Sequence, residues 1–97
     1  MKKLGLLATL KAKNGKEKEV HEFIKGAVEL ARKEDKTLTW YSFKIDENTF
    51  GIFDTFETEE GREAHLNGDI AKALMEHADR LLSEDPKIQK IEILSAK

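Results

Sequence analysis

Hydrophobic residues follow two different periods along the chain, and each change of period marks a boundary between predicted elements. Residues 4–13 form a short, largely apolar run that ends at Asn14-Gly15, a dipeptide typical of turns. From Lys16 to about Glu34 the apolar residues recur at intervals of three and four, which is typical of one face of a helix. The first third of the sequence therefore predicts a strand followed by a long helix with a charged, solvated face.

The middle of the chain is rich in β-branched and aromatic residues. Residues 37–45 and 49–56 each predict a strand, and the short polar connection between them predicts a hairpin. Thr58 follows, with Glu59 and Glu60 behind it. A hydroxyl followed by carboxylates is typical of a capped helix start, because both interact favourably with the free N–H groups of the first turn.

The last third continues as helix and then strand. Asn67-Gly68 divides the helical segment in two, and Asp69 is expected to cap a second piece that ends near Ser83. Residues 87–94 predict the final strand.

The order βαββαβ predicts an α+β, ferredoxin-like fold in a single domain over residues 1–97. This fold has a four-stranded antiparallel sheet with the helices on one face. The predicted strands nevertheless carry apolar side chains on both faces: Phe50 and Ile52 alternate with Gly51 and Phe53. A sheet with one solvated face would have a polar outer side. We therefore expect a second copy of the chain to cover the outer face, giving a homodimer.

Charge and composition exclude several classes of function. The 17 basic and 19 acidic residues leave a net charge of −2, which provides no field to attract nucleic acid or an acidic membrane. The absence of cysteine excludes disulfides, zinc fingers and iron–sulfur clusters. The Met-Lys-Lys start imitates a signal peptide, but the apolar run after it is short and no cleavage site follows. No stretch is long enough to span a membrane, and we expect a cytoplasmic location.

The segment TFGIFDTFETEEGREAHL at residues 49–66, together with Asn14-Gly15-Lys16, resembles the antibiotic biosynthesis monooxygenase (ABM) family of the dimeric α+β barrel superfamily. Members of that family carry a Gly-Lys-Glu turn, a tyrosine in strand two, an acid and an aromatic at the end of strand three, and Ala-His-Leu in the following helix. The positions that match this pattern are Gly15, Lys16, Glu17, Tyr41, Asp54, Phe56, Ala64, His65 and Leu66.

This resemblance implies a homodimeric barrel with a pocket for a small aromatic molecule in each subunit. Characterised members of the family include cofactor-free oxygenases that convert hydroxylated aromatics or quinols into quinones with dioxygen alone. Such chemistry requires a base for the phenolic proton and a dry pocket that holds the radical and the reduced oxygen together. We accordingly expect no cofactor and no metal.

His65 and Asp54 are the candidate catalytic residues. His65 is suited to acid–base chemistry near neutral pH, and the structural alternative is a cap or core histidine satisfied by the backbone. Asp54 lies among aromatic residues, where burial disfavours a carboxylate unless it is paired. Asp54 either orients His65, acts as the base itself, or makes a structural hydrogen bond to a loop or to Arg62.

Four further residues are expected to line the pocket or to fill the core: Trp40, Tyr41, Phe56 and Met75. Adjacent strand residues point to opposite faces, so one of Trp40 and Tyr41 faces the helices and the other faces the partner sheet. A metal site built from His65, His77 and a carboxylate has no recognised spacing, and His77 is expected to be a satisfied interior or interface histidine.

Three rival functions are less well supported by the residues. Haem-degrading relatives of the barrel carry an asparagine in strand one and a tryptophan at the end of strand three, where this chain has Ala8 and Phe56. RNA-recognition domains share the order of elements, but the first strand here has no aromatic residue on which a base could stack. A non-catalytic dimer that binds a small ligand remains an open alternative.

Overall fold

The computed structural model describes residues 3–97, and Met1 and Lys2 of the signal-like start lie outside this range. Four strands form one sheet in the order β2-β3-β1-β4, and every neighbouring pair is antiparallel. The elements in chain order are β1 (Leu4–Lys11), α1 (Glu17–Gly26), α2 (Val28–Ala31), β2 (Thr37–Asp46), β3 (Thr49–Phe56), α3 (Glu59–Leu66), α4 (Asp69–Leu81) and β4 (Lys87–Glu92).

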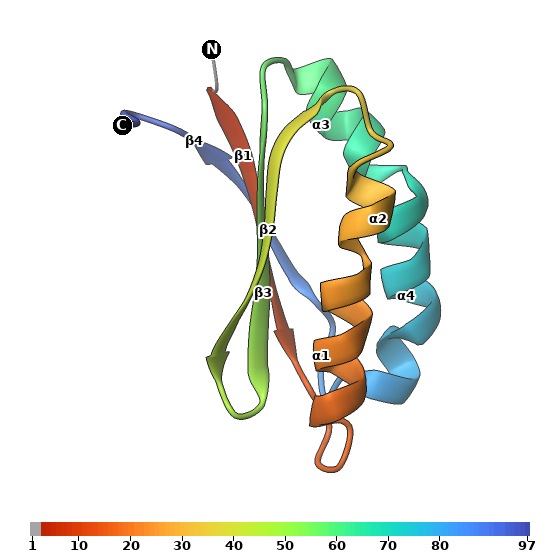
Figure 1. The fold of residues 1–97 in the computed structure, drawn as a ribbon. Helices are drawn as coiled ribbons and strands as arrows, with labels where there is room; N and C mark the ends of the chain where they lie inside the picture. The colour runs from red at the N-terminus through yellow and green to blue at the C-terminus, as the bar shows by residue number, and fades with distance from the viewer. Residues whose placement is uncertain (1–2) are drawn as a thin grey trace.

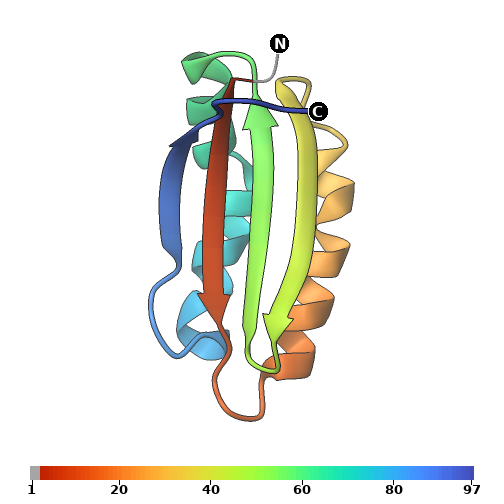
Figure 2. The same cartoon turned by 90° about the vertical axis from the view of Figure 1, so that its left-hand side faces the viewer.

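All four helices lie on the same side of the sheet, as Figure 1 shows with the sheet edge-on. The view turned by 90° looks onto the opposite face, which no element covers (Figure 2). The predicted ferredoxin-like α+β fold is therefore confirmed, with its helices segregated to one face. No helix in the part of the chain that the structure describes is long and apolar enough to cross a membrane.

The long helix predicted from Lys16 to about Glu34 is divided into α1 and α2. Gly26 ends α1 because glycine is a weak helix former that leaves the backbone free to turn. At the end of α2, Lys33 bonds the carbonyl of Leu30 and Glu34 bonds that of Ala31, three residues back in each case. These tighter, 3₁₀-type bonds end the helical segment before β2 begins.

The predicted helix start at Thr58 is confirmed, whereas the predicted cap at Asp69 is wrong. The Thr58 side chain accepts a hydrogen bond of 3.0 Å from the Gly61 N–H at the start of α3. At the start of α4 the cap position is held by Gly68, and Asp69 is the first helical residue. Its carboxylate then acts through the helix dipole, which attracts negative charge in the first turn.

The core lies between the helices and the inner face of the sheet. Leu10, Phe50 and Phe56 project from the central strands and are 0–1% exposed. Leu10 and Phe50 pack with the apolar faces of α1 and α4, whose buried residues recur at helical spacing: Val20, Ile24, Ile70, Leu74, Ala78 and Leu81. The amphipathic periods that predicted these helices thus correspond to the faces that they bury.

The outer face of the sheet carries aromatic rings laid over glycines. A Cβ atom at Gly51 would lie 2.4 Å from the ring of Phe43, and one at Gly5 would lie 3.0 Å from the ring of Phe53. Tyr41 stands on the same face and is 56% exposed. The apolar second face that the sequence predicts is therefore present and uncovered within one chain.

The edge strand β2 departs from regular pairing at both of its ends. Its register against β3 shifts between Thr37 and Thr39 and again between Lys44 and Asp46. Such irregularities twist an edge strand away from the flat geometry that a further strand would need.

Replacing Leu10 by alanine is expected to destabilise the domain by about 2–5 kcal/mol, because the side chain is fully buried between sheet and helices. Leu94→Ala is the matched control, since that leucine is 90% exposed and its loss should change stability little. Urea unfolding at a fixed protein concentration compares the two. Equal midpoints for both variants would contradict the assigned core.

Candidate functional site

A buried histidine stands where three separate segments meet. His65 lies in the last turn of α3, Asp54 lies near the end of β3, and Glu34 lies between α2 and β2. The Thr58 cap fixes the start of α3, and the pairing of Asp54 with Leu6 of β1 and Trp40 of β2 fixes the strand. The site is thus assembled from elements that the fold already holds in place.

The imidazole of His65 lies between the two carboxylates. Its Nδ1–H donates to Oε1 of Glu34 at 2.6 Å, and its Nε2 lies 2.8 Å from Oδ2 of Asp54. The second contact is an ion pair rather than an aligned hydrogen bond, and neither oxygen of Asp54 has a hydrogen-bond partner among the described residues. Both ring nitrogens of His65 are therefore occupied by acidic groups.

The pKa of His65 is raised above its usual value by this surrounding. Burial by itself lowers the pKa, because it disfavours the charged ring, but the contact with Asp54 and its charge raise it. The hydrogen bond to Glu34 and the charge of that residue raise it further, and the sum exceeds the effect of burial. The arrangement favours an imidazolium with both N–H groups directed at carboxylates.

Glu34 is held in place from two sides. The hydroxyl of Thr37 donates to the same Oε1 atom at 2.7 Å, and the backbone N–H of Thr37 bonds the Glu34 carbonyl. On the other side, a Cβ atom at Gly68 would lie 3.3 Å from Oε2 of Glu34. The absence of a side chain at Gly68 thus leaves room for the carboxylate beside the junction of α3 and α4.

A narrow cavity lies on the Asp54 side of the histidine. It has a volume of about 40 Å³ and is lined by Asp54, His65 and otherwise apolar side chains, including Leu6, Ile52, Leu74 and Ile88. Asp54 is only 1% exposed, and its Oδ1 atom is a buried acceptor without a donor among the described residues. A group that donates a hydrogen bond inside this cavity would satisfy it.

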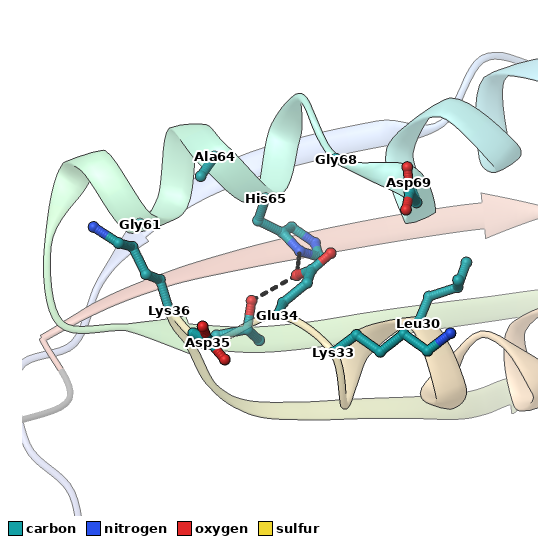
Figure 3. Close-up of a pocket in the computed structure, with 11 residues that line it drawn as sticks. Leu30, Lys33, Glu34, Asp35, Lys36, Gly61, Ala64, His65, Gly68 and Asp69 are labelled. Atoms are coloured by element: carbon teal, nitrogen blue, oxygen red, sulfur yellow. Dashed lines mark hydrogen bonds and ion pairs between the residues drawn. The ribbon is translucent and has the colours of Figure 1, made fainter.

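A wider pocket of about 380 Å³ opens on the Glu34 side, between the α2–β2 connection and the junction of α3 and α4 (Figure 3). Figure 3 shows the His65 ring directed toward Glu34, with charged side chains around the rim: Lys33, Asp35, Lys36 and Asp69. His65 thus lies between a wide pocket with a charged rim and a narrow, largely apolar cavity.

The structure brings together only some of the residues predicted to form the site. Asp54 and His65 are in contact, and the Phe56 ring packs against His65 with centroids 5.4 Å apart. Trp40 faces the helices and packs against the core, while Tyr41 faces the uncovered side, so the predicted division between these two is present. Met75 is 59% exposed and lies in a shallow surface groove outside the inner cavity.

The structural alternatives for these side chains are also clear. Arg62 donates to the carbonyls of Gly5 and Ile91 and not to Asp54. His77 packs its ring edge-on against Phe23, as a structural histidine does. Within residues 3–97 no group of three or more histidines and carboxylates has the geometry to hold a metal ion.

Glu34 is the member of the site that sequence reasoning missed. It stands in the charged run Lys33-Glu34-Asp35-Lys36, which looks like a solvated connection. The local features that could have indicated a role for Glu34 are its position between a helix end and a strand start, and the hydroxyl of Thr37 three residues later.

Comparison with solved structures agrees with the ferredoxin-like α+β fold. The fold is that of an antibiotic biosynthesis monooxygenase structure, with a TM-score of 0.81 at 16% identity over 95% of this chain and 99% of that one. The PA3566 protein from Pseudomonas aeruginosa gives a TM-score of 0.84 at 21% identity over 98% and 97% of the two chains. At these identities the likeness shows an ABM-like fold alone. No family model matches the sequence, and no curated protein matches it.

A more similar structure is NE2512, a protein of unknown function from Nitrosomonas europaea. It is 48% identical to this chain, with a TM-score of 0.97 over 100% of this chain and 94% of that one. The chain therefore belongs to the same family as NE2512.

The raised pKa of His65 makes stability depend on pH in a defined direction. The ion pairs of His65 should stabilise the fold fully below the unfolded pKa of about 6.5. This contribution should be lost as pH rises through the higher pKa of the folded state. Urea unfolding at a series of pH values from about 6 to 9 measures the loss.

His21→Gln is the control, because His21 is exposed, lies 2.9 Å from the carboxylate of Glu22 and meets the Phe50 ring edge-on, away from His65. This variant should keep the alkaline loss of stability seen in the unmodified protein. Stability that rises from pH 6 to pH 9 would show that His65 is not held as an imidazolium.

Proposed function

We propose that this protein is a cofactor-independent monooxygenase of the ABM type that oxidises a quinol or another polyphenol with dioxygen. The observation that carries the proposal is the carboxylate of Asp54, which is buried in an apolar cavity with an unpartnered oxygen. A phenolic hydroxyl is a donor of the kind that such an oxygen lacks. The residues that match the ABM pattern around Asp54 and His65 support the same reaction.

Asp54 is better placed than His65 to take the phenolic proton. Both nitrogens of His65 already contact carboxylates, so the ring has no free lone pair to offer. Oδ1 of Asp54 has no donor among the described residues, and the positive ring lies 2.8 Å from Oδ2. In this assignment Asp54 is the base and His65 is its electrostatic partner. The same occupation of both nitrogens argues against His65 as a haem ligand.

The reaction balances with dioxygen as the only co-substrate. Asp54 takes the phenolic proton, and the phenolate gives one electron to dioxygen, which leaves a phenoxyl radical and superoxide. These combine at a ring carbon to form a C–O bond, and the resulting peroxide takes the proton back from Asp54. Cleavage of the O–O bond with loss of the hydrogen on that carbon releases water. One oxygen atom then remains in the quinone and the other is in the water.

The inner cavity must widen to admit an aromatic ring. Its volume of about 40 Å³ is well below the roughly 150 Å³ of an apolar cavity that takes up benzene. Leu66 and Ile88 line the cavity and are the side chains most free to move, since Leu66 is half-buried and Ile88 is 45% exposed. Displacement of these two side chains would let the aromatic ring of the substrate enter, while the apolar walls of the cavity exclude water.

The proposal includes a homodimer formed through the outer face of the sheet. Tyr41, Phe43 and Phe53 project from that face, and no helix of the same chain covers them (Figure 2). Burial of such aromatic side chains against a second sheet would contribute a large apolar area. Tyr41 would then lie in the interface, apart from the cavity at Asp54.

Oxygen uptake tests the activity on a panel of hydroquinones and polyphenols, with quinone formation followed by absorbance. The unmodified protein should exceed the uncatalysed rate of oxygen uptake. Asp54→Asn should lower the catalysed rate by about 10²-fold or more, because the amide does not accept the proton. Asp85→Asn is the control, since Asp85 is exposed in the loop before β4.

Uncatalysed rates for the unmodified protein on every substrate would remove the oxygenase proposal and favour a small-ligand-binding protein. An active Asp54→Asn variant would remove Asp54 from the role of base.

Sedimentation equilibrium tests the dimer with two variants that introduce the same charge. Tyr41→Glu should yield monomers, because it places a carboxylate in the middle of the proposed apolar interface. Met75→Glu should remain dimeric, because Met75 is similarly exposed, 59% against 56%, but lies on the helical side. A monomeric unmodified protein at micromolar concentration would contradict the proposed interface.

A further inference from the structure

Glu34 has no part in the proposed reaction, yet it is bound to the central histidine of the site. Its carboxylate accepts from His65 at 2.6 Å and is 20% exposed, whereas Asp54 on the opposite side of the ring is almost fully buried. Glu34 therefore links the buried pair to the open pocket shown in Figure 3.

We propose that Glu34 is a positioning residue that fixes the rotation of the His65 ring and holds it doubly protonated against the buried carboxylate of Asp54. The use of Asp54 as a base rests on the proposed monooxygenase function. The effect of Glu34 on the protonation of His65 does not depend on any reaction.

The geometry carries this inference in three steps. The hydrogen bond from Nδ1 of His65 to Oε1 of Glu34 fixes the rotation of the ring, so that Nε2 faces Oδ2 of Asp54. The Thr37 hydroxyl donates to the same oxygen and restrains the carboxylate. Gly68 leaves the space in which Oε2 lies, 3.3 Å from where a Cβ atom would be. Two donors, one from α3 and one from β2, thus bind the same oxygen of this carboxylate and fix its orientation.

Charge explains why two carboxylates are needed. One imidazolium beside one buried carboxylate still loses much of its hydration, and burial favours the neutral forms of both groups. A second carboxylate at Nδ1 provides a hydrogen-bond acceptor for the other N–H and attracts the same positive charge. Glu34 contributes to the raised pKa of His65 in addition to Asp54.

The remaining charged groups near the ring are arranged differently. Those around the open pocket are of both signs and are not paired with His65: Lys33, Asp35, Lys36 and Asp69. On α3 itself, Arg62 bonds backbone carbonyls, and Glu63 is bound by Lys90 of β4 at 2.7 Å. Apart from Asp54, the inner cavity contributes apolar side chains. Glu34 and Asp54 are thus the two acids that contact the ring directly.

In the alternative, purely structural role, Glu34 only connects the α2–β2 segment to α3 through its hydrogen bond to His65. The two roles differ in what Glu34→Gln does. The glutamine side chain oxygen can still accept from Thr37 and from Nδ1–H, so the tie is kept while the charge is lost. A structural tie predicts an unchanged histidine, and a positioning role predicts one that loses its proton more readily.

The experiment is a pH titration of the His65 ring by ¹⁵N NMR in the unmodified protein, Glu34→Gln, Glu34→Asp and Asp35→Asn. Asp35 is the matched control, because it neighbours Glu34, lines the same pocket and does not contact His65. Glu34→Gln should lower the midpoint of the His65 titration by about one pH unit or more. Glu34→Asp, which keeps the charge but withdraws it from the ring, should give a smaller decrease, and Asp35→Asn should leave the midpoint nearly unchanged.

The inference is overturned if Glu34→Gln titrates like the unmodified protein, or if Asp35→Asn lowers the midpoint as much as Glu34→Gln. Should the glutamine variant not fold, the comparison of Glu34→Asp with Asp35→Asn decides by the same criterion. The titration requires no substrate, so a protein that consumes no oxygen still reports on Glu34. Where a substrate is turned over, Glu34→Gln should lower kcat more than it changes KM, because Glu34 does not reach the inner cavity.

Discussion

The site depends on one interaction, a buried imidazole that lies between two carboxylates. The same interaction ties the helical layer to the sheet. His65 connects α3 to β3 through Asp54 and to the α2–β2 connection through Glu34. Each of these groups would be costly to bury as an isolated charge, and together they are tolerated because opposite charges are in direct contact. Removal of any one of these three side chains would leave a buried charge without its partner. The polarity of the inner cavity therefore depends on all three.

Much of the fold is readable from the sequence because local signals and burial agree. The strand over 49–56 is found at the predicted residues, since its apolar and aromatic side chains fit a strand that lies between β2 and β1 and is covered by helices on one face. Thr58 caps α3 as its side chain and the acids behind it predict. Asp54 and His65 are also readable, because a carboxylate and a histidine in apolar surroundings require partners.

The remainder depends on contacts between distant parts of the chain. Glu34 and His65 are separated by 31 residues, and nothing in a charged connection distinguishes the one acid that turns inward from its neighbours. The division of the first helix at Gly26 and the cap at Gly68 are small changes of backbone geometry that an apolar period does not register. The placement of Met75 outside the cavity likewise follows from the rotation of α4 on the sheet, which spacing alone leaves undetermined.

The irregular register of β2 has a consequence for how this domain meets its surroundings. An uncovered sheet offers two kinds of contact: unpaired backbone groups along its border and side chains across its surface. The shifts at both ends of β2, and the lysines at positions 87 and 90 of β4, make the borders poor templates for adding another strand. The aromatic side chains of the uncovered face form the other contact surface, and it is on this surface that the proposed homodimer would form, as a closed pair that leaves no edge for further strands.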